Sequence, residues 1–104
     1  EHCSIVTFKK NSIRGNHYHK ISYQFSLILN GKFEIYYSKI NKNGNVIGKI
    51  KKKIVTERHL ITHPSFNAHA FKCLSKTGSI LAFACGLRGG KNYENDTFRI
   101  NLII

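Results

Sequence analysis

Short apolar runs separated by turn residues determine the fold class of this chain. The runs recur at roughly 8–12-residue intervals, the spacing typical of all-β sandwiches and barrels. No segment of helical length carries apolar residues at i, i+3, i+4 and i+7. The pattern therefore predicts an all-β barrel or two-sheet sandwich with about eight strands, over residues 5–8, 22–29, 32–40, 46–56, 60–62, 68–74, 79–85 and 97–104.

Turn residues and side-chain alternation refine this expectation. Asn30-Gly31 and Asn43-Gly44 each predict a tight hairpin, since both residue types accept the backbone angles such turns require. Residues 86–96, rich in Gly, Arg and Asn, are expected to be irregular. Alternation along 22–29 puts Gln24 and Ser26, with Ile28, on the inner face. The opposite, apolar face is then expected to meet a second sheet or a partner chain, and consists of Tyr23, Phe25, Leu27 and Leu29.

Length and composition indicate one globular domain spanning residues 1–104. No apolar run reaches the roughly 18 residues of a membrane helix, and the first residues lack a secretion signal. The absence of an initial Met suggests a trimmed or fragmentary chain. Cys3, Cys73 and Cys85 have no close spacing, so we expect reduced thiols in a cytoplasmic protein, with Cys73 and Cys85 buried.

A strong basic bias favours anionic partners. The chain has 17 Lys and Arg against 5 Asp and Glu, a formal net charge of +12. Residues 39–53 carry six lysines and no acid, without interleaved aromatic residues. A lysine-rich, solvated hairpin explains them better than a nucleic-acid surface does. A phosphorylated small molecule remains a suitable partner.

Histidine spacing is the sharpest chemical signal. On a strand, His17 and His19 project from one face, and His69 supplies a third imidazole from a separate strand-like segment. Three neutral imidazoles with one open position are typical of a catalytic metal site. Gln24 adds a weaker carbonyl ligand, so Zn²⁺, Fe²⁺, Ni²⁺ or Mn²⁺ suits the set better than Mg²⁺ or Ca²⁺. His59 and His63 are expected in a loop or at the rim.

The spacing Gly15-x-His-x-His-x4-Gln-x6-Gly31, followed by Pro64 and then His69, resembles the two motifs of the cupin superfamily. This resemblance covers residues 13–73 and implies a small double-stranded β-helix, a conical jelly-roll barrel that is often dimeric. Metal cupins usually have a glutamate where this chain has Gln24. They also usually have Pro-x-Gly-x-x-His, whereas Phe66 stands here in place of the glycine.

The segment from Arg14 to Lys20 is similar to the opening motif of cupins that modify nucleotide-linked sugars. Three groups of such cupins are similar: the C-terminal cupin of capsular-polysaccharide reductases, the 3,4-ketoisomerases and the deoxysugar 3,5-epimerases. The first of these also shares a tail like residues 95–98. The resemblance implies an isomerase or epimerase of a nucleotide-activated keto-sugar in surface-polysaccharide synthesis. His17 or His69 would then be the base. Arg14 and Lys20 would hold the diphosphate, and Tyr36 would contact substrate. Return of the proton would fall to Tyr18, with Tyr23 and Tyr36 as other candidates.

Two other functions stay open at this stage. A cupin that binds a metal or sugar without turnover fits the same residues, because cupins support many chemistries and some have none. A basic nucleic-acid-binding protein is the less favoured reading. We also expect a homodimer, formed through the apolar face of 22–29 and the apolar C-terminal residues Ile100, Leu102, Ile103 and Ile104.

Overall fold

The computed structural model describes residues 2–85 and 96–103. In this part of the chain there are nine strands and no helix, so none that is long and apolar enough to cross a membrane. The strands are β1 (His2–Lys9), β2 (Ile13–Tyr18), β3 (Tyr23–Asn30), β4 (Phe33–Ile40), β5 (Val46–Val55), β6 (Leu60–His63), β7 (Asn67–Cys73), β8 (Thr77–Cys85) and β9 (Phe98–Arg99).

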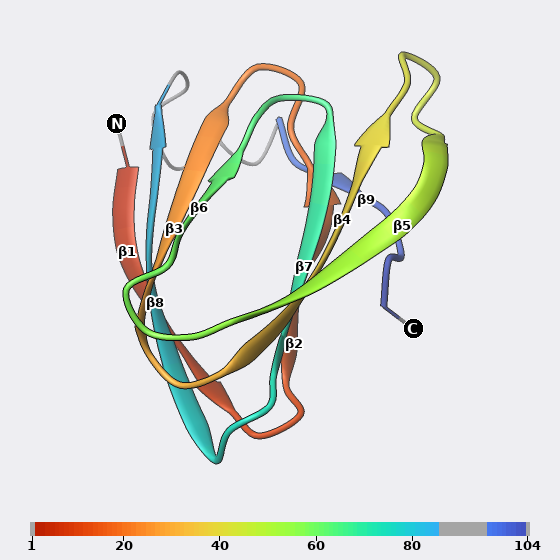
Figure 1. Ribbon diagram of the computed structural model, residues 1–104. Coiled ribbons are helices and arrows are strands. Elements are labelled where there is room, and N and C mark those ends of the chain that lie inside the picture. The colour runs from red at the N-terminus through yellow and green to blue at the C-terminus, as the bar shows by residue number, and fades with distance from the viewer. Residues whose placement is uncertain (1, 86–95, 104) are drawn as a thin grey trace.

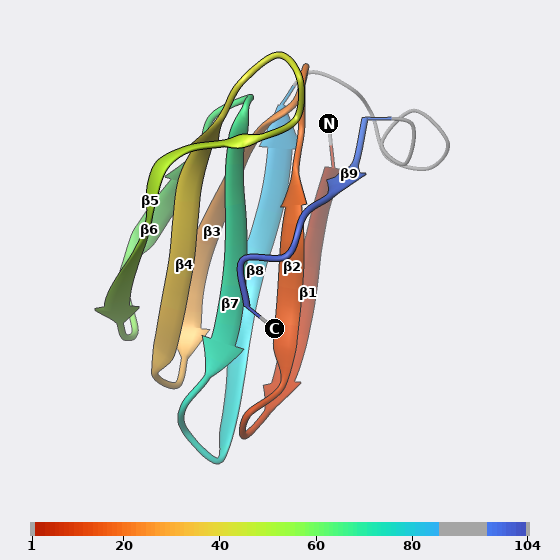
Figure 2. The ribbon, with the colours of Figure 1, turned by 90° about the vertical axis from the view of Figure 1, so that its right-hand side faces the viewer.

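Two antiparallel sheets pack face to face (Figures 1 and 2). One has the strand order β1-β8-β3-β6 and the other the order β5-β4-β7-β2-β9. Nearly every neighbouring pair is distant in sequence, so the chain crosses repeatedly between the sheets, as in a jelly roll. The all-β prediction is confirmed.

Two apolar clusters stabilise this arrangement. The first lies between the sheets and draws residues from both of them. It consists of Phe8, Ile28, Phe33, Ile35, Val55, Phe71, Cys73 and Ile80. The second contains Tyr18, Ile40, Ala68, Ala70 and Leu102, and the C-terminal segment crosses β2 and β7 to complete it (Figure 2).

The C-terminal region differs from its prediction. Instead of a strand over 97–104, only Phe98–Arg99 pairs with β2, and the chain then continues without regular structure. Leu102 is 7% exposed, and Ile100 and Ile103 pack against the second cluster. These apolar residues therefore pack on the chain's own sheet, with Leu102 buried and Ile100 and Ile103 partly buried, and their part in a dimer stays a prediction. Ile104 lies outside the described residues.

The two predicted hairpins have opposite outcomes. Asn43-Gly44 does join a paired hairpin, β4 and β5, with Gly44 at a φ of 84°. Asn30-Gly31 does not, because β3 pairs with β6 and β8 whereas β4 pairs with β5 and β7. Gly31 has the expected positive φ of 97°. Turn residues specify a reversal of the chain and leave the pairing partner open, and here the reversal leads into the other sheet.

Strand β3 follows the predicted alternation. Ser26 and Ile28 are 6% and 1% exposed, while Tyr23 on the opposite face is 40% exposed. Cys73 is a buried free thiol as expected, and Cys3 is free and exposed. The side chain of Cys85 and the stretch 86–95, predicted to be irregular, lie outside the described residues.

Candidate metal and substrate site

A bulge in β2 brings the histidines together. The register with β7 shifts between Gly15 and His17, and Gly15 and Asn16 have positive φ values of 99° and 54°. A Cβ on Gly15 would lie 2.7 Å from the carbonyl oxygen of His69, so only glycine permits this close approach. The register then sets His17 directly opposite His69.

His19 reaches the cluster from just beyond the strand. β2 ends at Tyr18, so the two histidines do not share a continuous strand as predicted. Their ring centroids nevertheless lie 4.9 Å apart, and those of His17 and His69 are separated by 4.7 Å. One ring nitrogen from each of the three histidines lies within 4.8 Å of the others. The predicted convergence of these three side chains is present in the structure.

Asp96 fixes the orientation of His19. The Nδ1–H of His19 donates to the backbone carbonyl of Asp96 at 2.9 Å, which leaves the lone pair on Nε2 in the neutral ring. The Asp96 carboxylate accepts backbone N–H groups of Lys20, Ile21 and Ser22 at 2.8–3.1 Å. Burial raises the pKa of Asp96, but these hydrogen bonds outweigh it and lower the pKa overall. Asp96 thus clamps the segment that follows His19.

All histidines of the cluster favour the neutral form. Burial, followed by the charges of His19 and Arg99, lowers the pKa of His17 to about 4. Burial also lowers the pKa of His19 and holds the pKa of His69 well below its usual range. Neutral imidazoles are the form that ligates metal. As unassisted bases near pH 7, the same groups would be weak.

His63 is a fourth member that the sequence reading placed wrongly, in a loop or at the rim. It lies on β6 opposite Gln24 and is 4% exposed. Its ring stacks on that of His69 with centroids 4.0 Å apart, and its Nε2 lies 3.0 Å from Ser26 Oγ. Proximity to Pro64 constrains only the backbone, whereas the β3–β6 register directs the side chain inward.

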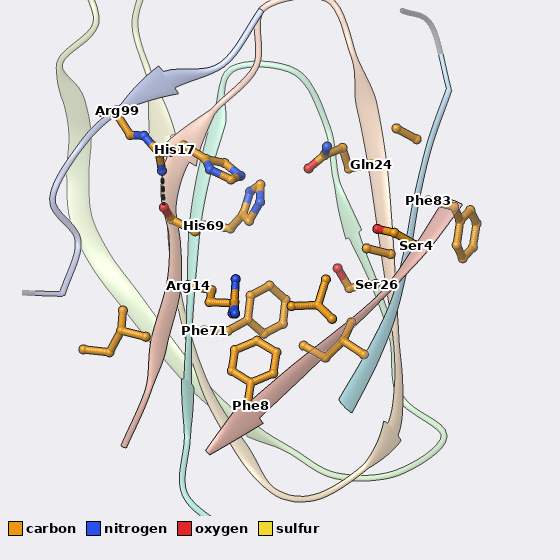
Figure 3. Close-up of a pocket in the computed structure, with 16 residues that line it drawn as sticks. Ser4, Phe8, Arg14, His17, Gln24, Ser26, His69, Phe71, Phe83 and Arg99 are labelled. Carbon is orange, nitrogen blue, oxygen red and sulfur yellow. Dashed lines mark hydrogen bonds between the residues drawn. The ribbon is translucent and has the colours of Figure 1, made fainter. Parts of the chain in front are cut away.

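A cavity of about 530 Å³ opens beside the cluster, between the two sheets (Figure 3). His17, His69 and Arg99 approach it from one side, and Gln24 and Ser26 from the other. Phe8 and Phe71 lie in its apolar part, where the Arg14 guanidinium carbon lies 5.8 Å from the centre of the Phe8 ring. The cavity therefore combines histidine side chains and two guanidinium groups with an apolar surface.

Arg99 is a cavity residue that sequence reasoning missed. The β2–β9 register places it beside His17, and its Nη1 donates to the Gly15 carbonyl at 3.2 Å. The motif-like tail over 95–98 ends one residue before it. Arg99 lies more than 80 positions from His17 in the sequence, so no local sequence pattern links the two residues. Their contact follows only from the pairing of β9 with β2.

Four of the predicted site residues do not line the cavity: His19, which belongs to the histidine cluster, and Tyr18, Lys20 and Tyr36. Tyr18 points to the other face of β2, where it is 6% exposed and stacks on Phe98 at 5.4 Å. Lys20 lies with its Nζ 4.4 Å from the centre of the Phe98 ring. Tyr36 donates its hydroxyl to Glu34 Oε1 at 2.6 Å, near the second apolar cluster. Strand alternation explains Tyr18, since its two histidine neighbours face inward.

Phe66 retains the turn that precedes His69. Its φ of 58° is in the left-handed region, although a side chain is strained there. Its N–H donates to the His19 carbonyl at 2.7 Å, and its carbonyl accepts the N–H of Ile40 at 2.9 Å. The replacement of the usual glycine therefore leaves the local geometry in place and keeps the two histidine segments connected.

No protein-family model matches this sequence, and none of the curated proteins is detectably similar to it. Solved structures do resemble it. The Staphylococcus aureus capsular polysaccharide assembling protein CapF superposes with a TM-score of 0.78 at 19% identity, over 94% of this chain and 26% of CapF. The fold is that of the cupins.

Two further structures extend the comparison. The Legionella pneumophila 3,5-epimerase RmlC, solved with dTDP-4-keto-L-rhamnose, has a TM-score of 0.77 at 17% identity, over 96% of this chain and 53% of RmlC. Drosophila melanogaster CENP-C bound to CAL1 has a TM-score of 0.68 at 12% identity, over 80% of this chain and 60% of that one. The chain thus spans about a quarter of CapF and about half of RmlC. The similar structures thus include an epimerase and a protein bound to another protein.

Proposed function

We propose that this chain is a sugar-nucleotide isomerase or epimerase module that acts on a nucleotide-activated keto-sugar. The observation that carries the proposal is the placement of His17, His69, Arg14 and Arg99 around one cavity between the sheets. Imidazoles and guanidinium ions are the groups that a proton transfer next to a diphosphate requires. The cupin fold shared with RmlC adds support.

The three clustered imidazoles fit a divalent transition metal, for which Zn²⁺, Fe²⁺, Ni²⁺ and Mn²⁺ remain the candidates. Their nitrogens lie within 4.8 Å of one another, and His17 Nδ1 is buried without a hydrogen-bond partner among the described residues. The pairing of His19 Nδ1 with Asp96 leaves Nε2 as its ligand atom. Gln24 lines the same cavity and supplies a further oxygen. When bound, such an ion would polarise a carbonyl and stabilise the charge of an enolate.

The chain's own residues would bind and orient the substrate. Arg14 and Arg99 offer bidentate donors to the diphosphate, and their positive charges draw an anionic ligand towards the histidines. Lys20, the other candidate from the sequence, does not line the cavity. Phe8 and Phe71 supply an apolar surface that excludes water. Without a metal, His17 or His69 would take the proton directly, as a weak base because burial lowers its pKa.

Solvent deuterium exchange tests the enzymatic proposal. The protein is incubated in D₂O with a panel of dTDP- and UDP-linked 4-keto sugars, and incorporation next to the carbonyl is measured by mass spectrometry. We expect exchange with at least one sugar and a loss of about 10²–10⁴-fold in His17→Gln and His69→Gln. Binding of thymidine and uridine diphosphate, followed by calorimetry, should weaken at least about tenfold in Arg14→Gln and Arg99→Gln. Lys20→Gln serves as the matched control and should bind as the parent does.

A binding cupin without turnover is the second candidate. Among the described residues, no tyrosine, aspartate or glutamate lines the cavity, so its usual proton-transfer groups are limited to His17 and His69. Nucleotide-sugar binding without deuterium exchange would establish this function. Absence of both binding and exchange would rule out the sugar-nucleotide proposal as a whole.

A further inference from the structure

We propose that His63 and Ser26 form a buried pair that positions His69 for its role in the histidine cluster. This inference rests on the proposed function, since it concerns the same site. His69 is the histidine most enclosed by other rings. Its plane is therefore set by its neighbours, and His63 is the neighbour that lies flat against it.

The contact geometry is that of a supporting stack. The His63 and His69 ring centroids are 4.0 Å apart with an interplanar angle of 26°. His17 meets His69 edge-on at 4.7 Å and an angle of 89°. Phe71 contacts both His63 and His69 edge-on, at 5.6 and 6.2 Å. These three rings flank His69 and restrict its rotation about the side-chain bonds.

Ser26 in turn holds His63. Its hydroxyl lies 3.0 Å from His63 Nε2, and both side chains are buried, at 6% and 4% exposure. The pair bridges two strands of one sheet, β3 and β6, and faces β7 of the other sheet across the interior. A buried polar pair is less stable than apolar residues unless both partners are satisfied. An apolar residue would fill the same space without this requirement, which points to a role beyond packing.

His63 would act on metal binding through the orientation of the His69 ring that it supports. Partners of ligating histidines commonly contribute 10–100-fold to metal affinity. His63 is a positioning residue in this account, because its ring nitrogens are not part of the group of three whose nitrogens converge.

Four variants separate the stack from the hydrogen bond. His63→Ala removes both, His63→Phe keeps a ring against His69 without the nitrogen, and Ser26→Ala removes only the hydroxyl. His59→Ala is the matched control, an exposed histidine four positions away in the same segment. Circular dichroism reports whether each variant folds. If His63→Ala does not fold, His63→Phe and Ser26→Ala still test the inference, because they leave no large cavity at the site.

Two readouts are measured, Co²⁺ affinity from the visible absorption of the bound ion and the His69 ring signals in NMR spectra of metal-free protein. We expect a Co²⁺ affinity about 10–100-fold weaker in His63→Ala, intermediate losses in His63→Phe and Ser26→Ala, and no change in His59→Ala. His69 should give one set of ring signals in the parent and shifted or multiple sets in His63→Ala.

Parental Co²⁺ affinity together with unchanged His69 signals in all three cluster variants would overturn the inference. If the parent itself binds no Co²⁺, the metal part of the proposed function fails. The His69 signals of His63→Ala, or of Ser26→Ala if the His63→Ala variant does not fold, then decide the positioning role alone.

Discussion

Acidification should destabilise the metal-free protein strongly between pH 7 and pH 5. The pKa of His17 is lowered from 6.5 to about 4 and that of His63 to about 3, in both cases first by burial. The unfolded chain, with ordinary histidines, therefore binds more protons than the folded chain throughout this window. The free energy of unfolding rises with pH wherever the unfolded state binds more protons, so it must fall as the pH drops.

The size of the effect follows from the two pKa values. At pH 5 an ordinary histidine is almost fully protonated when unfolded, whereas His17 and His63 remain mostly neutral in the fold. Each then contributes about 2 kcal/mol of lost stability between pH 7 and pH 5, or about 4 kcal/mol for the pair. His19 and His69 shift in the same direction and add to this. A loss of this size is a large fraction of the 5–15 kcal/mol typical of a domain.

Urea unfolding at pH 7, 6 and 5, followed by circular dichroism in the presence of a chelator, measures this dependence. His63→Phe removes one titrating group and should reduce the loss by about 2 kcal/mol, while His59→Ala should leave the slope unchanged. A free energy of unfolding that stays constant from pH 7 to pH 5 would contradict this prediction, since it would mean that these rings are not buried in the neutral form.

Three further predictions concern the scaffold. We propose that the protein dimerises through the outer face of the β1-β8-β3-β6 sheet, where one continuous row consists of Ile5, Leu81, Leu27 and Leu60. Light scattering should give a dimer for the parent and a monomer for the double variant Ile5→Lys, Leu60→Lys. A monomeric parent at micromolar concentration would contradict this. Gly15→Ala should lower stability by at least about 2 kcal/mol, because of its φ of 99° and the 2.7 Å approach to the His69 carbonyl; a melting temperature equal to that of the parent would contradict it. Asp96→Ala should lower the free energy of unfolding by about 3 kcal/mol, since three backbone N–H groups would lose their acceptor. If chemical denaturation gives values for parent and variant that differ by less than about 0.5 kcal/mol, as for a surface substitution, water replaces the carboxylate and the prediction is wrong.

Local periodicity predicted the elements of this fold better than their partners. Alternation placed Ser26 and Ile28 inward correctly, because a strand fixes the face of each side chain. The same rule, applied to His17 and His19, also implies that Tyr18 points away from them. Sequence alone could not show that Asn30-Gly31 leads into the other sheet, since pairing depends on contacts between strands far apart in the chain.

The candidate site was predictable to the same limited extent. His17, His19 and His69 were found from spacing, and the structure brings them together. His63 and Arg99 were missed because their positions depend on the β3–β6 and β2–β9 registers. The bulge at Gly15 and the clamp by Asp96 have no periodic signature, yet they orient two of the three histidines.

Metal stoichiometry tests directly whether His17, His19 and His69 form a metal site. Protein purified without an affinity tag is dialysed against Zn²⁺, then against metal-free buffer, and analysed by inductively coupled plasma mass spectrometry. We expect close to one equivalent in the parent and a large loss in His17→Gln and His69→Gln, with His59→Ala retaining the ion. A parent protein that retains no stoichiometric metal, or one whose metal content is unaffected by the loss of His17 and His69, would contradict it.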